Sequence, residues 1–114
     1  MTYEVIYSAD AERDFELIFD FLLKSYVEFG EASDSAASHA QQRLLDIHDD
    51  IEKLGNAPYC GTLHDTIAAG LRHVTLGRAI VWFDINEDDR TVRILAIFFG
   101  GQDHVRHMLA RLLQ

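Results

Sequence analysis

Two histidines near the end of the chain form the pattern that most resembles a metal or acid–base site. His104 and His107 are three residues apart and directly follow Asp103. Residues three apart lie on one face of a helix, so the two imidazoles can share a ligand. Because no spacing fixes a third ligand, we predict no metal and no other cofactor, and we expect these histidines at a surface or an interface. A metal site would need His64, Asp65 or His73 to complete it.

Other side chains of catalytic type lack the partners that catalysis needs. Cys60 is the only cysteine and follows Pro58 and Tyr59 without an orienting signature. We therefore predict an ordinary reduced thiol, which can form neither an internal disulfide nor a cysteine-based zinc site. The carboxylate pairs 49–50 and 88–89 are adjacent in sequence, and adjacent residues do not converge on one substrate. No serine elbow, phosphate loop or zinc-protease helix is present, so we assign no catalytic residue.

Charge divides the sequence into two unlike parts. The 114 residues include 19 Asp or Glu and 10 Lys or Arg, and the formal net charge of −9 disfavours direct binding to nucleic acid. Thirteen of the acidic residues lie in the first 60 positions, whereas residues 61–114 hold six Arg and no Lys. Arginine suits planar and bidentate contacts, so we expect a polar target to bind the second part. The target-binding candidates are Arg72, His73, Arg78, His104, Arg106 and His107.

Length and composition indicate one compact domain over residues 1–114, of which 48% are apolar. The longest apolar run, 94–99, is far too short to cross a bilayer. The first residues also lack the basic and apolar segments of a signal peptide. We therefore expect no membrane association and a cytoplasmic location.

Hydrophobic periodicity predicts an α+β domain. A β-branched and aromatic run at 3–7 ends at Ser8, a good helix N-cap, and apolar residues then recur every three or four positions up to Gly30. A second helical pattern begins at Ser33 or Asp34 and stops before Gly55, so the two helices should form an antiparallel hairpin. After a loop, we expect three strands and a final helix capped by Asp103, at 71–76, 79–86, 91–99 and 104–113.

The three expected strands should form an antiparallel meander with two apolar faces. Gly77 and Arg78 suit the two-residue type II′ turn that joins the first pair of strands. The strands at 79–86 and 91–99 are apolar on both sides, and a large bare apolar face is uncommon on a monomer. The helical hairpin can cover one face, and the final helix or a partner must cover the other.

Three segments carry a resemblance to a known family. They are Gly70-Leu71-Arg72-His73, the run from Leu76 to Ile85, and the run Ile-Leu-Ala-Ile-Phe-Phe-Gly-Gly-Gln-Asp-His from Ile94 to His104. With the order of the elements, they make almost the entire chain similar to the RelE/ParE toxin superfamily. The resemblance implies an N-terminal strand and an α-helical hairpin packed on an antiparallel sheet, in the order β-α-α-β-β-β-α.

This resemblance implies the toxin of a bacterial type II toxin–antitoxin system, which serves plasmid or chromosome stabilisation. A cognate antitoxin, ParD-like or related, would neutralise it in a hetero-oligomer. RelE-like members cut mRNA in the ribosomal A site, whereas ParE-like members poison DNA gyrase. Arg72, and less closely Arg78, match the cations of the RelE-like nucleases, whose other cations and histidine are replaced here by Ala96, Phe99, Gly101 and Gln102. We therefore predict a ParE-like toxin that binds gyrase and is not a ribonuclease.

Two alternatives stay open. One is a RelE-like, ribosome-dependent mRNA endonuclease that uses Arg72, Arg78 and a terminal histidine as acid or base. The other is a non-toxic partner that modulates repression by its antitoxin.

The acidic first half suggests how an antitoxin would bind. We expect an amphipathic arm whose Lys and Arg face the acidic helical hairpin and whose apolar anchors lie on the sheet. The antitoxin-binding candidates are Asp46, Asp49 and Asp50 on the hairpin, and Trp82, Ile80 and Phe99 on the sheet.

Overall fold

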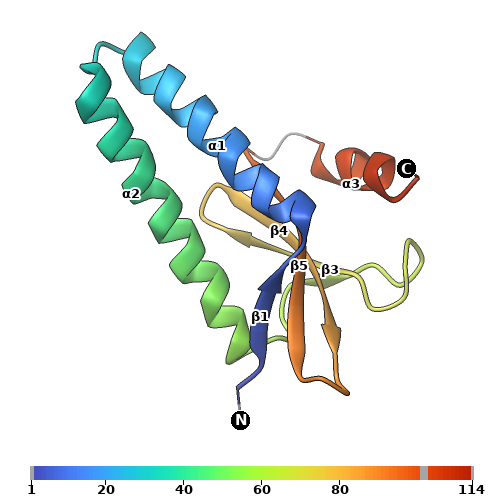
Figure 1. Cartoon of the computed structure of the whole chain (residues 1–114). Helices are drawn as coiled ribbons and strands as arrows, with labels where there is room; N and C mark the ends of the chain where they lie inside the picture. Colours follow the sequence, from blue (N-terminus) through green and yellow to red (C-terminus); the bar gives the residue numbers. More distant parts are fainter. Residues whose placement is uncertain (1, 101–102, 114) are drawn as a thin grey trace.

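The computed structural model describes residues 2–100 and 103–113 and shows an α+β fold (Figure 1). The predicted order of helices and strands is confirmed, with a two-residue strand added inside the expected loop. No helix within the described ranges is long and apolar enough to span a membrane. The elements are β1 (Glu4–Tyr7), α1 (Ala9–Glu28), α2 (Ser33–Glu52), the 3-10 turn η1 (Lys53–Gly55), β2 (Thr62–Leu63), β3 (Arg72–Leu76), β4 (Ala79–Asn86), β5 (Thr91–Phe99) and α3 (His104–Leu112).

The described strands form one sheet in the order β1-β5-β4-β3-β2. β3, β4 and β5 make the predicted antiparallel meander, and β2 pairs with β3 in the antiparallel direction. β1 is parallel to β5, with Glu4 opposite Thr91 and Tyr7 opposite Ile94, so the sheet is mixed rather than antiparallel throughout. A period of two predicts which side chains share a face but not the direction of the neighbouring strand, which accounts for the difference.

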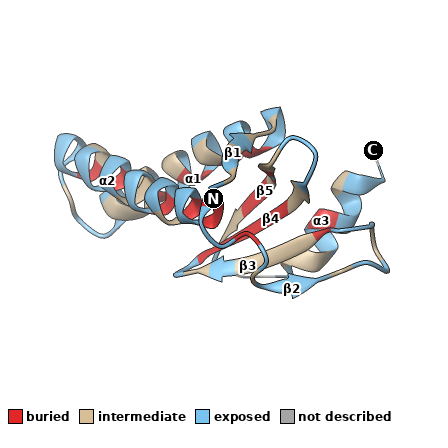
Figure 2. Cartoon of the chain, turned by 90° about the horizontal axis from the view of Figure 1, so that it is seen from below, coloured by how far each residue is buried: buried red, intermediate tan, exposed pale blue. Residues whose placement is uncertain are grey.

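Helices cover both faces of the sheet, the α1–α2 hairpin on one side and α3 on the other (Figure 2). In β4, Val81 and Phe83 point to the hairpin, and Ile80 and Trp82 point to α3. The expectation that the final helix covers the second face is therefore confirmed. The larger core includes Ile18, Leu22, Ile47, Ile51, Val81, Phe83, Val92 and Ile94. The smaller core comprises Leu71, Ile80, Trp82, Ala96 and Met108.

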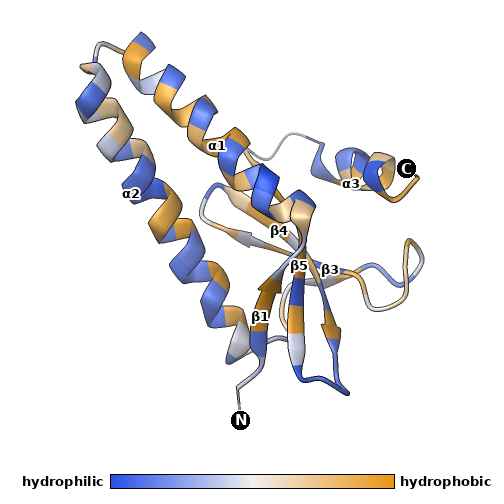
Figure 3. Cartoon of the chain, viewed as in Figure 1, coloured by the Kyte–Doolittle hydropathy of each residue, from blue (hydrophilic) through white to orange (hydrophobic). Residues whose placement is uncertain are grey.

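The helices present apolar stripes toward these cores (Figure 3). Ser8 caps α1 as predicted, because its Oγ accepts a hydrogen bond from the Ala11 amide at 3.1 Å. The expected cap of α2 at Ser33 or Asp34 is wrong by one or two residues, since Ala32 occupies the N-cap position and forms no side-chain cap. Asp103 does occupy the N-cap position of α3, but its side chain makes no cap hydrogen bond.

Candidate functional site

Three histidines from separate parts of the chain meet around Trp82. His64 Nε2 and His73 Nδ1 lie 2.6 Å apart, so one ring must donate the proton that the other accepts. The ring centres of His73 and His104 are 4.7 Å apart, and all three imidazoles lie within 5.5 Å of the Trp82 ring. We call His64, His73 and His104 the histidine cluster. Each of these histidines was a candidate from the sequence, but only the fold shows that they are in contact.

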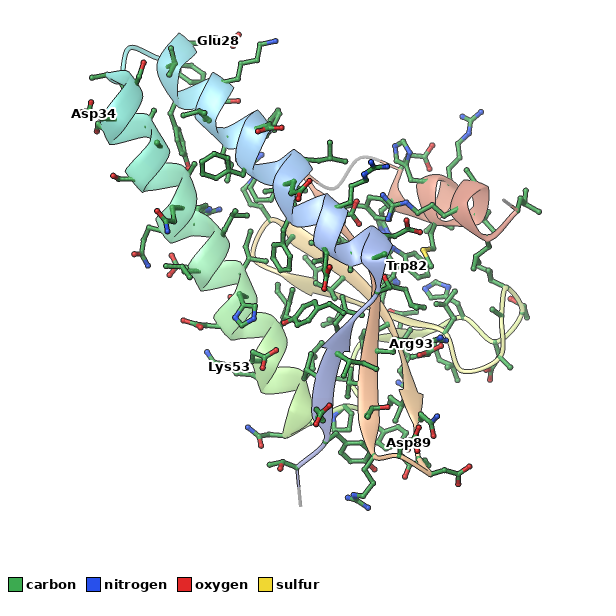
Figure 4. All side chains as sticks on the ribbon, viewed as in Figure 1. Glu28, Asp34, Lys53, Trp82, Asp89 and Arg93 are labelled. Atoms are coloured by element: carbon green, nitrogen blue, oxygen red, sulfur yellow. The ribbon has the colours of Figure 1, made fainter. Side chains whose placement is uncertain are left out.

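Each member of the cluster is held by a different element. His73 lies on β3 directly opposite Trp82 of β4. His64 follows β2, and its amide donates to the Leu71 carbonyl at 2.7 Å. The loop between them is closed by Asp65, whose carboxylate accepts from the Gly70 amide at 2.8 Å. His104 is the first residue of α3, and Trp82 lies on the sheet beside that helix (Figure 4).

The surroundings of His73 and His104 oppose protonation of their rings. Burial lowers the pKa of His73, and the imidazoles of His104 and His64 lower it further. Burial and His64 also lower the pKa of His104, although Asp103 opposes this shift. Within residues 2–100 and 103–113, no three metal-ligating side chains converge closely enough to hold a metal ion. The cluster is therefore three imidazoles in mutual contact, two of which have a lowered pKa.

The six target-binding candidates do not form one surface. Arg72 points to the face opposite His73, where it donates to the Cys60 carbonyl and lies over the Tyr59 ring. Arg78 lies over the Phe99 ring, on the side of the helical hairpin. The residues that the endonuclease alternative requires, two arginines and a terminal histidine, are therefore not all together, because Arg72 and Arg78 lie away from the histidine cluster. The other two candidates are on α3, where His107 contacts Phe98 and Arg106 is exposed.

The antitoxin-binding candidates also separate into groups. Trp82 is 0% exposed and Ile80 is 5% exposed beneath α3, so this structure does not offer them to a partner. This corrects the expectation of accessible anchors there, because Met108 and Leu71 already cover that part of the sheet. Phe99 is only partly covered and remains available. The three candidate carboxylates of α2 lie outside the core. Asp46 and Asp49 are exposed, and Asp50 is half-buried beside Lys53.

A buried ion pair joins α1 to α3 and was not foreseen from the sequence. Arg111 Nη2 and Nη1 donate to the two oxygens of Asp14 at 2.6 and 2.7 Å, and the Ile97 amide donates to the same carboxylate at 2.8 Å. The hydrogen bond with Asp14 raises the pKa of Arg111. The sequence did hold a signal, since Asp14 falls on the apolar stripe that Ala11 and Ile18 define.

An apolar groove flanked by arginines runs beside α1. One part, of about 310 Å³, is lined by residues that include Phe21, Phe29, Arg43, Arg78 and Phe99. A second part, of about 220 Å³, shares Phe21 and Phe99 and extends to Phe98 and Arg111. Phe21 is 58% exposed and Phe29 is 89% exposed. We call this surface the phenylalanine groove and define it by Phe21, Phe29, Phe98, Phe99, Arg43, Arg78 and Arg111.

The arginines of the phenylalanine groove lie on its aromatic rings. Arg43 and Arg78 lie 5.8 and 5.7 Å from the centre of the Phe99 ring, and Arg111 lies 4.9 Å from that of Phe98. These stacking contacts hold guanidinium groups at the edge of an apolar surface. Arg111 is paired with Asp14, which also lines the second part, so the positive charge of the groove comes from Arg43 and Arg78, in a protein with a net charge of −9.

No protein-family model matches the chain, and no curated protein is significantly similar to it. Solved structures are similar in fold. A chain of the chromosomal ParDE toxin–antitoxin system from P. aeruginosa aligns over 86% of this chain and 96% of its own length, with 19% identity and a TM-score of 0.63. A chain of the RelBE2 toxin–antitoxin complex from Mycobacterium tuberculosis aligns over 87% and 92%, with 20% identity and a TM-score of 0.55.

A double mutant of the E. coli toxin RelE in the free state aligns over the full length of both chains, with 8% identity and a TM-score of 0.53. At such identities the likeness concerns the fold. The same order of elements was expected from residues 70–104 and from the periodicity of the sequence. The chain thus has the RelE/ParE-like toxin fold that its sequence predicts.

Proposed function

We propose that this chain is the ParE-like toxin of a bacterial toxin–antitoxin pair, that it acts in the cytoplasm by binding a protein, and that its target is DNA gyrase. The observation that carries this proposal is the separation of Arg72 and Arg78 from the histidine cluster. Cleavage of RNA without a metal needs cations that hold the phosphate beside the acid and the base. Two cations on the opposite side of the sheet cannot do so.

The test of this proposal compares two cellular readouts after expression of the chain. DNA supercoiling by gyrase is followed together with primer extension on translated mRNA. We expect trapped gyrase–DNA cleavage complexes and no new mRNA ends. New ends within codons of translated messages, with normal supercoiling, would refute the gyrase proposal.

One observation favours the endonuclease as a second candidate. The histidine cluster places imidazoles in mutual contact, and imidazole is the side chain that most often serves as a general acid or base. If the chain cuts mRNA, the variants His73→Ala and His104→Ala should abolish cleavage while Arg72→Gln and Arg78→Gln leave most of it. A toxin that acts on gyrase should tolerate the two histidine changes unless they unfold it.

We further propose that the antitoxin binds the phenylalanine groove through an amphipathic segment with apolar anchors and acidic side chains. Exposed Phe21 and Phe29 supply the apolar area, and Arg43 and Arg78 supply the complementary charge. This location differs from the acidic hairpin expected from the sequence, where a basic arm would meet Asp46 and Asp49. Net charge suggested the hairpin, but the combination of apolar area and charge favours the groove.

Salt dependence separates these two locations. The chain is co-expressed with the product of the adjacent reading frame, and the affinity of the complex is measured at several salt concentrations. We expect Arg43→Gln combined with Arg78→Gln to weaken binding and to reduce its salt dependence. The matched variant, which combines Asp46→Asn, Asp49→Asn and Asp50→Asn, should change neither the affinity nor its salt dependence. The opposite pattern would place the antitoxin on the hairpin and refute the groove.

A further inference from the structure

The contacts that hold α3 against the sheet and α1 differ in chemistry along the helix. At its beginning, His104 packs against His73 and Trp82. In its middle, Met108 is 3% exposed in the smaller core. Near its end, Arg111 forms the buried ion pair with Asp14. The first turn of α3 is therefore held by imidazole packing and by Val105, which packs against the smaller core, whereas the last turn is held by an ion pair.

The histidine cluster is packed as if its rings were neutral. Ring centres 4.7 and 4.8 Å apart separate His73 from His104 and from His64. Positive charge on two of these rings would place like charges almost in contact on a partly buried surface, where water screens them poorly. His104 Nδ1 is buried without a hydrogen-bond partner, so a proton added there has no acceptor in the described part of the chain.

The charged groups around the cluster are mostly engaged elsewhere. On the loop, Asp65 accepts from the Gly70 amide, and on β4 Asp84 is paired with Arg93 of β5 at 2.6 Å. Arg72 of β3 points to the other face, and on α3 Asp103 lies 4.0 Å from Arg106. His107 contacts Phe98 rather than the cluster. Asp103 is thus the carboxylate that favours a charged His104, whereas burial and His64 oppose that charge.

We propose that the histidine cluster is an acid-sensitive latch, which holds the first turn of α3 on Trp82 when neutral and releases it when protonated. The ion pair between Asp14 and Arg111 keeps the far end of the helix attached, so release is a local opening rather than loss of the fold. Opening uncovers Trp82 and Ile80, which are buried in this structure.

The direction of the pH effect follows from which state binds more protons. The closed state lowers the pKa of His73 and of His104, so the open state takes up protons at a higher pH. Closure is therefore complete above the ordinary histidine pKa of about 6.5 and weakens as the pH falls below it. Acid opens the latch, and return to neutral pH closes it.

Trp82 is the only tryptophan, so its fluorescence reports on this site alone. The purified protein is titrated between about pH 8 and pH 5, and three signals are followed: emission wavelength, quenching by acrylamide and far-UV circular dichroism. We expect emission to shift to longer wavelength and acrylamide quenching to rise in one reversible step, while the circular dichroism stays constant. Unchanged wavelength and quenching, or a simultaneous loss of circular dichroism, would overturn the proposal.

Variants assign the step to the cluster. His73→Phe combined with His104→Phe keeps aromatic packing without a titrating proton and should abolish the step. If that variant does not fold, His104→Gln alone should move its midpoint to lower pH. Arg111→Gln, which loosens the far end of α3, should move the midpoint to higher pH. His39→Gln and His48→Gln on α2 are the matched controls and should leave the step unchanged; a step that disappears with either control would refute the assignment.

Discussion

The Asp14 carboxylate accepts a hydrogen bond from the Ile97 amide of β5, beyond the point where β1 ends. β1 pairs with β5 only as far as Ile94. Beyond it, the Ser8 amide donates to the Ile94 carbonyl and the Ser8 hydroxyl donates to the Leu95 carbonyl. The Ile97 amide would be the next donor without a strand partner, and it donates to Asp14 at 2.8 Å. Because Arg111 neutralises that carboxylate, one side chain links α1, β5 and α3.

Removal of one partner from this ion pair should destabilise the protein unequally. Arg111→Gln leaves the buried Asp14 charge without its cation, so we expect it to lower the free energy of unfolding by about 3–5 kcal/mol. Asp14→Asn keeps an acceptor for the Ile97 amide and leaves a guanidinium that is partly exposed, so a loss of about 1–3 kcal/mol is expected. Urea unfolding of both variants measures the difference, and an equal or reversed order would contradict this account.

Trp82 should tolerate a smaller aromatic ring better than a truncation. Trp82→Ala opens a large cavity in the smaller core, and we expect it to lower the free energy of unfolding by about 3–5 kcal/mol. Trp82→Phe should cost less, because the indole nitrogen has no hydrogen-bond partner to lose within the described residues. Thermal unfolding followed by circular dichroism compares the two. A phenylalanine variant as unstable as the alanine variant would show that the indole nitrogen is bound after all.

Two glycines with the same backbone angle provide a matched test of the close approach beside the histidine cluster. Gly61 and Gly70 both have φ of +75°, but a Cβ at Gly61 would lie 2.1 Å from the His73 carbonyl oxygen, whereas one at Gly70 meets nothing within 4 Å. Gly70→Ala should lower stability by about 1–2 kcal/mol through strain alone. Gly61→Ala should lower it further and displace β2 from β3, which chemical shifts of the His73 ring would reveal. Equal losses would exclude the steric explanation.

Tyr7 makes part of the stability sensitive to alkali. Burial raises the pKa of Tyr7, and its hydrogen bond to Glu52 at 2.6 Å raises it further. The folded state therefore keeps a proton that the unfolded chain releases near pH 10, and this contribution is present below that pH and lost as the pH rises through the folded value. Absorbance titration should show one tyrosine that ionises only on alkaline unfolding. In Tyr7→Phe this tyrosine should be missing, and its presence there would contradict the assignment.

The sequence predicted what depends on local periodicity and failed where distant segments meet. The alternation in 79–86 and the cap at Ser8 were sufficient to predict β4 and the start of α1, and both are confirmed. The parallel pairing of β1 was not predictable, because no local pattern encodes the direction of a strand 80 or more residues away. Among the candidate site residues, chemistry suggested His73 and His104 separately, but their contact depends on how α3 crosses the sheet.

Arg72 and His73 illustrate the limit most clearly. They are adjacent in the motif that carries the family resemblance, yet alternation along β3 sends them to opposite faces of the sheet. Consecutive residues of one sequence motif therefore belong to two different surfaces of the protein. The phenylalanine groove was missed for a related reason, since its members come from α1 and its C-cap, α2, the turn after β3, the end of β5 and α3.

The parallel pairing of β1 with β5 also governs the order in which the chain can fold. Among the strands of the described residues β1 pairs with β5 alone, and that partner is made more than 80 residues later during synthesis. Until Thr91–Phe99 leaves the ribosome, the α1–α2 hairpin has no sheet centre on which to bury its apolar stripe. Such distant contacts slow folding, so the nascent protein stays incomplete, and open to chaperones or proteases, until β5 has been made.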